Sequence, residues 1–163
     1  MNGKTIFSIA SDMAKTFNRD PYIAASENGV IVSFKDLGSL KGVFLSSLPK
    51  PAIVINEKLD GNMRKIVCAH ELGHFILHKD QTFSCEDILF TDKATAGKCE
   101  REANLFASAF LIDPEDATDI LRNGYTAYEA ASILKTDVNL LLFLLNILGL
   151  CDEPDSCFLK QNP

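Results

Sequence analysis

The segment His70–His78, which reads HELGHFILH, holds the residues of this chain best suited to metal chemistry, and it contains all three histidines. If the segment is helical, His70 and His74 lie one turn apart on the same face, so both imidazoles can bind one ion. Glu71 is rotated by about 100° from His70, which keeps its carboxylate near the ion but outside the ligand shell. The pattern predicts a metal-dependent hydrolase with Glu71 as the general base.

Helix geometry excludes the third histidine, His78, from the ligand set. On a straight helix it lies about 12 Å along the axis from His70, and no ion reaches both at bonding distance. Another common arrangement places a histidine six residues after the second one, beyond a glycine turn. Here Leu77 and Asp80 occupy those two positions, so that arrangement is closed. We expect His78 to line the cleft or to cap the helix.

The third ligand must come from another segment, and Cys99–Phe110 (CEREANLFASAF) supplies a candidate. Projected at about 100° per residue, Glu100 lies on the inward side of this helix, whereas Glu102 points to solvent. A carboxylate on the core-facing side is costly unless it is paired or bound to metal. We therefore expect His70, His74 and Glu100 to bind the metal, with a fourth position open for water, as in catalytic zinc sites.

Small and amide residues on the same two segments agree with this assignment. Asn104 lies one turn after Glu100, where its amide oxygen can accept the free N–H of a ligating imidazole, or its side chain can hold Glu100 in place. Gly73 inside a helix costs about 1 kcal/mol relative to alanine, which close approach of another backbone would explain. Ala103 and Ala107 are small for the same reason, because two helices that share one ion must pack closely.

Periodicity elsewhere predicts the elements that position these residues. Helical spacing of apolar residues covers 5–18, and three strand-like runs follow at Val30–Phe34, Gly42–Ser46 and Ala52–Asn56. The short connections between these runs favour an antiparallel meander. Helical patterns and one polar loop (80–96) fill the rest, with helices expected at 59–79, 98–112, from Pro114 to Gly124, 127–135 and 138–148.

This order of elements predicts an α+β fold, in which a small three-stranded antiparallel sheet packs on the motif helix and a helical C-terminal half follows. The length of 163 residues suits a single domain, which we place at 1–150. Within it we expect the sheet and the metal-site helices over 1–112 and a helical subdomain over 113–150. Residues 151–163 are expected to form a loose tail.

Charge and composition narrow the function classes. The chain has 22 acidic and 16 basic residues, a net charge of −6 and no block of Lys or Arg, so direct binding of nucleic acid is not expected. The segment 126–150 has the outline of a helix-turn-helix, but its second helix is almost wholly apolar. Such a helix offers little to read bases or hold phosphate, so we interpret it as core or as a substrate-docking element.

The cysteines, the N-terminal segment and the apolar stretches favour a cytoplasmic protein without membrane association. Five cysteines without a CxxC pair indicate neither a disulfide framework nor a four-cysteine zinc knuckle. The first apolar runs are broken by Asp12 and Lys15, unlike those of a signal peptide. The most apolar stretch, Val138–Leu150, is well short of the roughly 20 residues of a membrane-spanning helix.

Two motifs, HELGHFILH at 70–78 and EREANLFASAFLIDP at 100–114, resemble those of the ImmA/IrrE metallopeptidases, and the strand-like AIVIN before the first motif also fits. The resemblance covers roughly residues 30–148. The second motif ends in LIDP, where many members have a more apolar run before the proline, and we expect this departure to affect packing only.

The resemblance implies a gluzincin-like fold with one zinc ion on the ligands assigned above and with Glu71 as the base. Members resembling ImmA are anti-repressors of mobile elements that cleave a helix-turn-helix repressor, and members resembling IrrE cleave a repressor of the DNA-damage response. The implied function is a zinc endopeptidase whose partner is such a repressor. The alternative is a non-catalytic, metal-containing protein that sequesters a transcriptional regulator. The intact Glu71 and the open coordination position favour the enzyme.

The sequence leaves alternatives open for two features of substrate binding, the strand that receives the substrate and the group that stabilises the oxyanion. We expect the substrate to lie extended along an exposed strand edge. Ala52–Asn56, just before the motif helix, is the first choice for that edge, and the alternative is that it forms an internal strand. The group that stabilises the oxyanion has three candidates, which are His78, Tyr125 and Tyr128.

Overall fold

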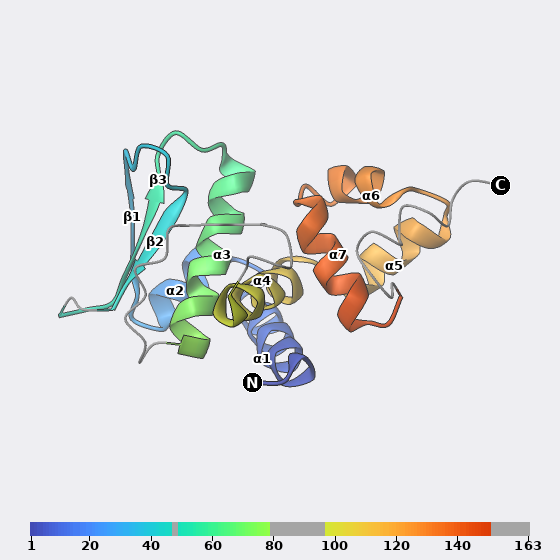
Figure 1. Ribbon diagram of the computed structural model, residues 1–163, viewed down its shortest axis with the longest axis horizontal. Helices are drawn as coiled ribbons and strands as arrows, with labels where there is room; N and C mark the ends of the chain where they lie inside the picture. The colour runs from blue at the N-terminus through green and yellow to red at the C-terminus, as the bar shows by residue number, and fades with distance from the viewer. Residues whose placement is uncertain (47–48, 79–96, 151–163) are drawn as a thin grey trace.

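The computed structural model describes residues 1–46, 49–78 and 97–150. The helices and strands, in chain order, are α1 (Gly3–Thr16), α2 (Pro21–Glu27), β1 (Ile31–Lys35), β2 (Gly42–Leu45), β3 (Ala52–Asn56), α3 (Gly61–His78), α4 (Lys98–Leu111), α5 (Pro114–Arg122), α6 (Ala127–Ile133) and α7 (Val138–Ile147). Figure 1 shows the sheet at one end, α3 beside it, and α5–α7 at the other end. The predicted α+β class, with a small sheet on the motif helix and a helical C-terminal half, is confirmed.

The predicted helices are present with small shifts at their ends, and α2 has no counterpart among them. Its start carries a recognisable signal, because the side chain of Asp20 accepts hydrogen bonds from the N–H groups of Tyr22 and Ile23 and Pro21 is the first helical residue. The predicted loop at 80–96 and the predicted tail at 151–163 lie outside the described residues.

The sheet is mixed, so the predicted antiparallel meander is wrong. Its strand order is β1-β3-β2, with β1 parallel to β3 and β2 antiparallel to β3. All five residues of β3 are buried, whereas β1 exposes Ile31, Phe34 and Lys35. The central position covers a strand on both edges, and the strand whose five residues are all buried takes it. The prediction of a meander used only the lengths of the connections and took no account of how deeply each strand is buried.

Helix α3 packs against β2 and β3 and also against α4. Gly73 is the point of closest approach to α4, because a Cβ at this position would lie 3.2 Å from the Cα and the carbonyl oxygen of Ala103 and 3.2 Å from the Cβ of Phe106. Ala103 and Ala107 are fully buried at the same helix pair. The expectation that small residues let these two backbones approach is confirmed.

The C-terminal helices join the rest of the molecule mainly through α7, which packs on α4 and on α6. The helix buries five leucines, so its interpretation as core is confirmed; they are Leu140, Leu141, Leu142, Leu144 and Leu145. Among the described residues, no single helix is long and apolar enough to cross a membrane. The helices α6 and α7 meet the length and composition criteria only when taken together, and they are bent by 110° relative to each other.

Candidate metal centre

The two motif histidines and the glutamate of α4 converge on one point. One donor atom from each of His70, His74 and Glu100 lies within 4.8 Å of the other two. The Nε2 atoms of the histidines are 3.1 Å apart, Glu100 Oε2 lies 3.3 Å from Nε2 of His70, and Glu100 Oε1 lies 3.2 Å from Nε2 of His74. All three side chains are buried. The structure thus brings together the three residues that the sequence predicts as ligands.

Local helix structure produces this convergence. Asp60 begins α3, because its carboxylate accepts a hydrogen bond of 2.9 Å from the N–H of Met63. The helix then runs unbroken to His78, so residues separated by four positions face the same way. On the other side of the site, α4 starts at Lys98, which puts Glu100 in its first turn. The positive end of the helix dipole favours a carboxylate there.

Asn104 orients one of the two imidazoles. Its Oδ1 lies 2.9 Å from Nδ1 of His70, and both groups are buried. An amide oxygen can only accept, so Nδ1 of His70 carries the proton and Nε2 presents its lone pair to the cluster. Of the two roles expected for Asn104, the contact with a ligating imidazole is the one observed. Contacts of this kind fix the orientation of a metal-binding histidine.

The donor set fits a divalent cation. Within the described residues, both carboxylate oxygens of Glu100 are buried and make no hydrogen bond of normal geometry, so their nearest polar neighbours are the imidazole nitrogens. Burial raises the pKa of Glu100, but its contacts with His70 and His74 outweigh this effect and hold the pKa well below its usual range. An ionised, buried carboxylate needs compensation, and an ion bound by two imidazoles and one carboxylate supplies it.

Glu71 is a buried residue of α3, and its side chain lies beside strand β2. Only 3% of its surface is exposed, and a Cβ on Gly42 would lie 3.5 Å from its Cγ and would overlap Val67. Strand β2 therefore passes directly over the turn of α3 that carries Glu71. Gly42 was not among the predicted site residues, although a glycine that opens a strand-like run is a recognised signal of close backbone approach.

The strand chosen as the substrate edge is an internal one. Strand β3 pairs with β1 on one side and with β2 on the other, and all of its residues are buried. The first choice for the edge, Ala52–Asn56, is therefore wrong, and the alternative of an internal strand is correct. An apolar run of this kind is stabilised most at the centre of a sheet, which leaves β2 as the outer strand beside Glu71.

His78 faces Glu102 rather than the ligand cluster. Its Nε2 lies 3.3 Å from Oε2 of Glu102, and it is not one of the three clustered donors. Burial lowers the pKa of His78, and the Glu102 carboxylate opposes this shift. The solvent-facing position predicted for Glu102 is wrong, because its side chain is buried and also lies 2.8 Å from the amino group of Met1. Helix α1 packs on α4 and covers this face.

The two tyrosines considered for the oxyanion belong to the C-terminal helices. Tyr125 is 45% exposed and precedes α6, and Tyr128 is 61% exposed on α6 itself. Helix α6 packs mainly on α5 and α7, at the end of the molecule away from the sheet (Figure 1). A contact of either tyrosine, or of His78, with substrate or oxyanion stays a prediction.

An α+β fold that holds an HExxH helix against a second helix bearing a glutamate ligand defines the class of HExxH metallopeptidases. Within that class, the chain belongs to the peptidase M78 family, because the family model described as the IrrE N-terminal-like domain matches residues 25–141. The match confirms the resemblance to the ImmA/IrrE family and implies a metallopeptidase-type function. The matched segment contains all three clustered ligands and Glu71. A search of curated proteins gave no match.

Proposed function

We propose that the chain is a zinc-dependent endopeptidase that cleaves a helix-turn-helix transcriptional repressor. The observation that carries the hydrolase assignment is the buried convergence of His70, His74 and Glu100, with Glu71 beside them on α3. Two imidazole nitrogens and one carboxylate are a common donor set of catalytic zinc sites, which supports zinc as the ion. The repressor as substrate is supported by membership of the family and by what its members are known to cleave.

The chemistry assigned to the residues is general acid–base catalysis. A zinc ion on the three ligands supplies Lewis-acid activation of a water molecule and of the scissile carbonyl. Glu71 accepts a proton from the attacking water and then donates it to the leaving amine. Asn104 keeps the proton of His70 on Nδ1, so Nε2 stays available as a donor atom.

Strand β2 is the element along which we place the substrate. It is an outer strand of the described sheet, and it passes over the turn of α3 that carries Glu71. A peptide that runs beside Val43–Leu45 can add to the sheet through backbone hydrogen bonds. An extended peptide in that position brings its scissile bond toward Glu71, whereas β3 is paired on both sides and cannot receive it.

Cleavage of a repressor by the purified protein tests this function. The zinc-loaded chain is incubated with the helix-turn-helix repressor encoded beside its gene, and fragments are identified by mass spectrometry. We expect one defined cleavage that stops when a chelator is added or when Glu71→Gln replaces the wild type. The matched control is Glu115→Gln, which removes an exposed carboxylate on α5 and should cleave as the wild type does.

Two outcomes would contradict the proposal in different ways. Cleavage that persists in Glu71→Gln would remove Glu71 from the mechanism while leaving the peptidase function intact. Release of the repressor from DNA without any fragment would support sequestration by a non-catalytic protein instead. Gel-shift and mass-spectrometric readouts of the same reaction separate these outcomes.

A further inference from the structure

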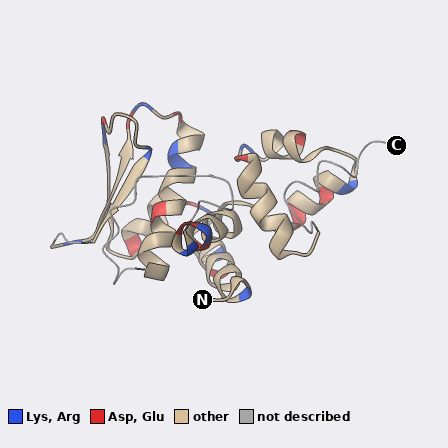
Figure 2. Cartoon of the chain, viewed as in Figure 1, with Lys and Arg blue, Asp and Glu red and all other residues tan. Residues whose placement is uncertain are grey.

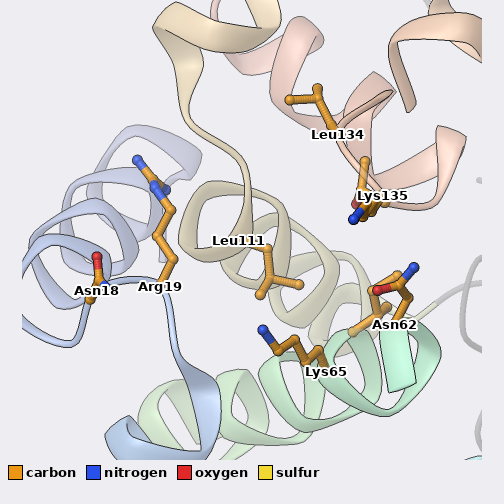
Figure 3. Close-up of a pocket in the computed structure, with 9 residues that line it drawn as sticks. Asn18, Arg19, Asn62, Lys65, Leu111, Leu134 and Lys135 are labelled. Carbon is orange, nitrogen blue, oxygen red and sulfur yellow. The ribbon is translucent and has the colours of Figure 1, made fainter. Parts of the chain in front are cut away.

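We propose that a pocket between α3 and the turn into α7 binds a small phosphate-bearing molecule. The pocket has a volume of about 300 Å³, which is in the range of small-molecule sites. Four segments line it, and Figure 3 shows the α1–α2 turn on one side, the turn before α7 on the opposite side, α3 below them and Leu111 of α4 at the centre. None of the three clustered metal ligands is part of the lining, so this is a separate site.

The charge of the lining is the first observation that indicates an anion. Arg19, Lys65 and Lys135 line the pocket and no carboxylate does, although the chain as a whole carries a net charge of −6. Figure 2 marks basic positions on the first half of α3 and on the turn between α6 and α7. Cations gathered at one pocket repel one another, and a bound anion removes that repulsion.

The three cations are not equivalent. Arg19 is held by the end of α4, because it donates to the carbonyl oxygen of Ile112 at 3.0 Å and pairs with Asp113 at 2.6 Å. The side-chain ammonium groups of Lys65 and Lys135 have neither a hydrogen-bond nor an ion-pair partner among the described residues. The two lysines are therefore the groups left to bind a ligand, because Asp113 already compensates the charge of Arg19.

Backbone conformation is a second observation at the same place. The non-glycine residues with positive φ in the described part of the chain are Asn18, Arg19 and Lys135, at 50°, 54° and 53°, and all three line the pocket. They follow the C-terminal ends of α1 and α6, where glycine is the usual residue. Asparagine tolerates this conformation, but arginine and lysine do not favour it. The hydrogen bond of 2.9 Å from the N–H of Thr136 to the carbonyl oxygen of Ala131 caps α6 in this conformation, and the cap fixes the position of Lys135 at the pocket.

The rest of the lining indicates what the phosphate is attached to. The side-chain amides of Asn18 and Asn62 supply donors and acceptors, and the hydroxyl of Thr136 is buried without a hydrogen-bond partner among the described residues. Apolar walls come from Ile66, Leu111 and Leu134. A phosphate at the two lysines, joined to a sugar or nucleoside body against these walls, matches this lining better than a bare ion does.

Titration of the zinc-loaded chain by isothermal calorimetry tests the proposal. The probes are AMP, ribose 5-phosphate and inorganic phosphate, with adenosine as the uncharged comparison. We expect the two organic phosphates to bind, adenosine not to bind, and added salt to weaken binding. Saturating AMP should raise the melting temperature by roughly 5 °C or more, because it binds only the folded state.

Charge-reversal variants locate the binding. Lys65→Glu and Lys135→Glu should each weaken the binding of AMP by about tenfold or more. Lys35→Glu, the same change at an exposed position of β1, should leave it unaltered. Lys65→Gln and Lys135→Gln remove the charge without reversing it, and they repeat the test if a reversed variant folds poorly.

Two results would overturn the proposal. One is the absence of binding for all three phosphate-bearing probes at about 10 mM, which is weaker than most specific sites. The other is AMP binding that is equally tight in the pocket variants and in Lys35→Glu, which would assign the anion to the metal centre. Binding of inorganic phosphate alone, weakened by both pocket variants, would support the anion site and reduce the ligand to the phosphate group.

Discussion

Helices α3 and α7 both bury apolar side chains, but only α3 also buries histidines and a glutamate. Helix α3 buries three histidines and a glutamate, His70, Glu71, His74 and His78, whereas α7 buries only leucines. A buried leucine contributes about 1.5–3 kcal/mol to folding, while a buried ionisable group costs free energy unless a partner or an ion compensates it. The difference indicates that α7 stabilises the fold, whereas α3 carries two histidines that, with Glu100, could hold a metal ion.

Helix α4 connects these two helices. It contacts α3 through Ala103 and bears Glu100 and Asn104 toward the cluster, and it also packs against α7. The buried leucines of α7 therefore stabilise α4, and α4 in turn holds Glu100 and Asn104 in position beside α3. The comparison can be tested by changing one helix at a time and measuring stability and activity separately.

The largest expected effect comes from Glu71→Gln. Loss of the general base should lower kcat/KM for repressor cleavage by about 10³-fold, which corresponds to roughly 4 kcal/mol in the barrier. The shape of the side chain is kept, so the melting temperature and the bound zinc should stay close to those of the wild type. A large drop in melting temperature would show that Glu71 is chiefly a packing residue, like the leucines of α7.

Leu144→Ala is the converse change in α7. Removal of a fully buried leucine should lower the free energy of unfolding by about 3 kcal/mol. Urea unfolding measures this loss, and the specific activity of the folded fraction should be unchanged. Reduced zinc affinity in the folded variant would mean that α7 shapes the metal site and is more than a structural support.

Asn104→Ala should have an intermediate effect, confined to the metal. Loss of the contact with Nδ1 of His70 should weaken zinc binding by about 10- to 100-fold, as measured by competition with a chromophoric chelator. Asn139→Ala, at an exposed position of α7, is the control and should bind zinc as the wild type does. Equal zinc affinity in the two variants would show that the contact between Asn104 and His70 does not contribute to zinc binding.

Gly73→Ala should give the smallest effect. The new Cβ meets backbone atoms of Ala103 at 3.2 Å, so α3 and α4 must separate slightly, while the better helix propensity of alanine offsets part of the cost. We expect a net loss of about 1 kcal/mol in stability. Gly61→Ala on the same helix meets nothing within 4 Å and should be neutral or stabilising. Thermal unfolding of the two variants side by side measures the difference.

Features that depend on local spacing were predictable from the sequence. Two histidines four residues apart, and a glutamate on the apolar side of a second helix, are set by helix periodicity alone, and the structure brings all three together. The segment that covers Glu102 was not predictable in the same way. A helical projection gives the direction of Glu102 from its own axis, but it cannot show that Met1, 101 residues away in the chain, covers it.

The sheet illustrates the same limit. Alternation and turn residues predict each strand separately, and the bounds of β3 agree with the predicted ones. The strand order depends on which strand gains most from being covered on both edges, and Asn56 secures it by donating to the carbonyl oxygens of Gly38 and Leu40 in the connection between β1 and β2. Neither effect is visible in connection lengths.

The contact between Asn104 and His70 has a consequence for the timing of assembly. Helix α4 supplies one ligand, Glu100, and also the amide that sets the tautomer of a ligand on α3. Both contributions depend on the docking of α4 against α3, and the set is complete only after residue 104 has been synthesised. The complete set of three candidate ligands therefore forms only after α3 and α4 have packed together, so tight metal binding at this site would require that packing.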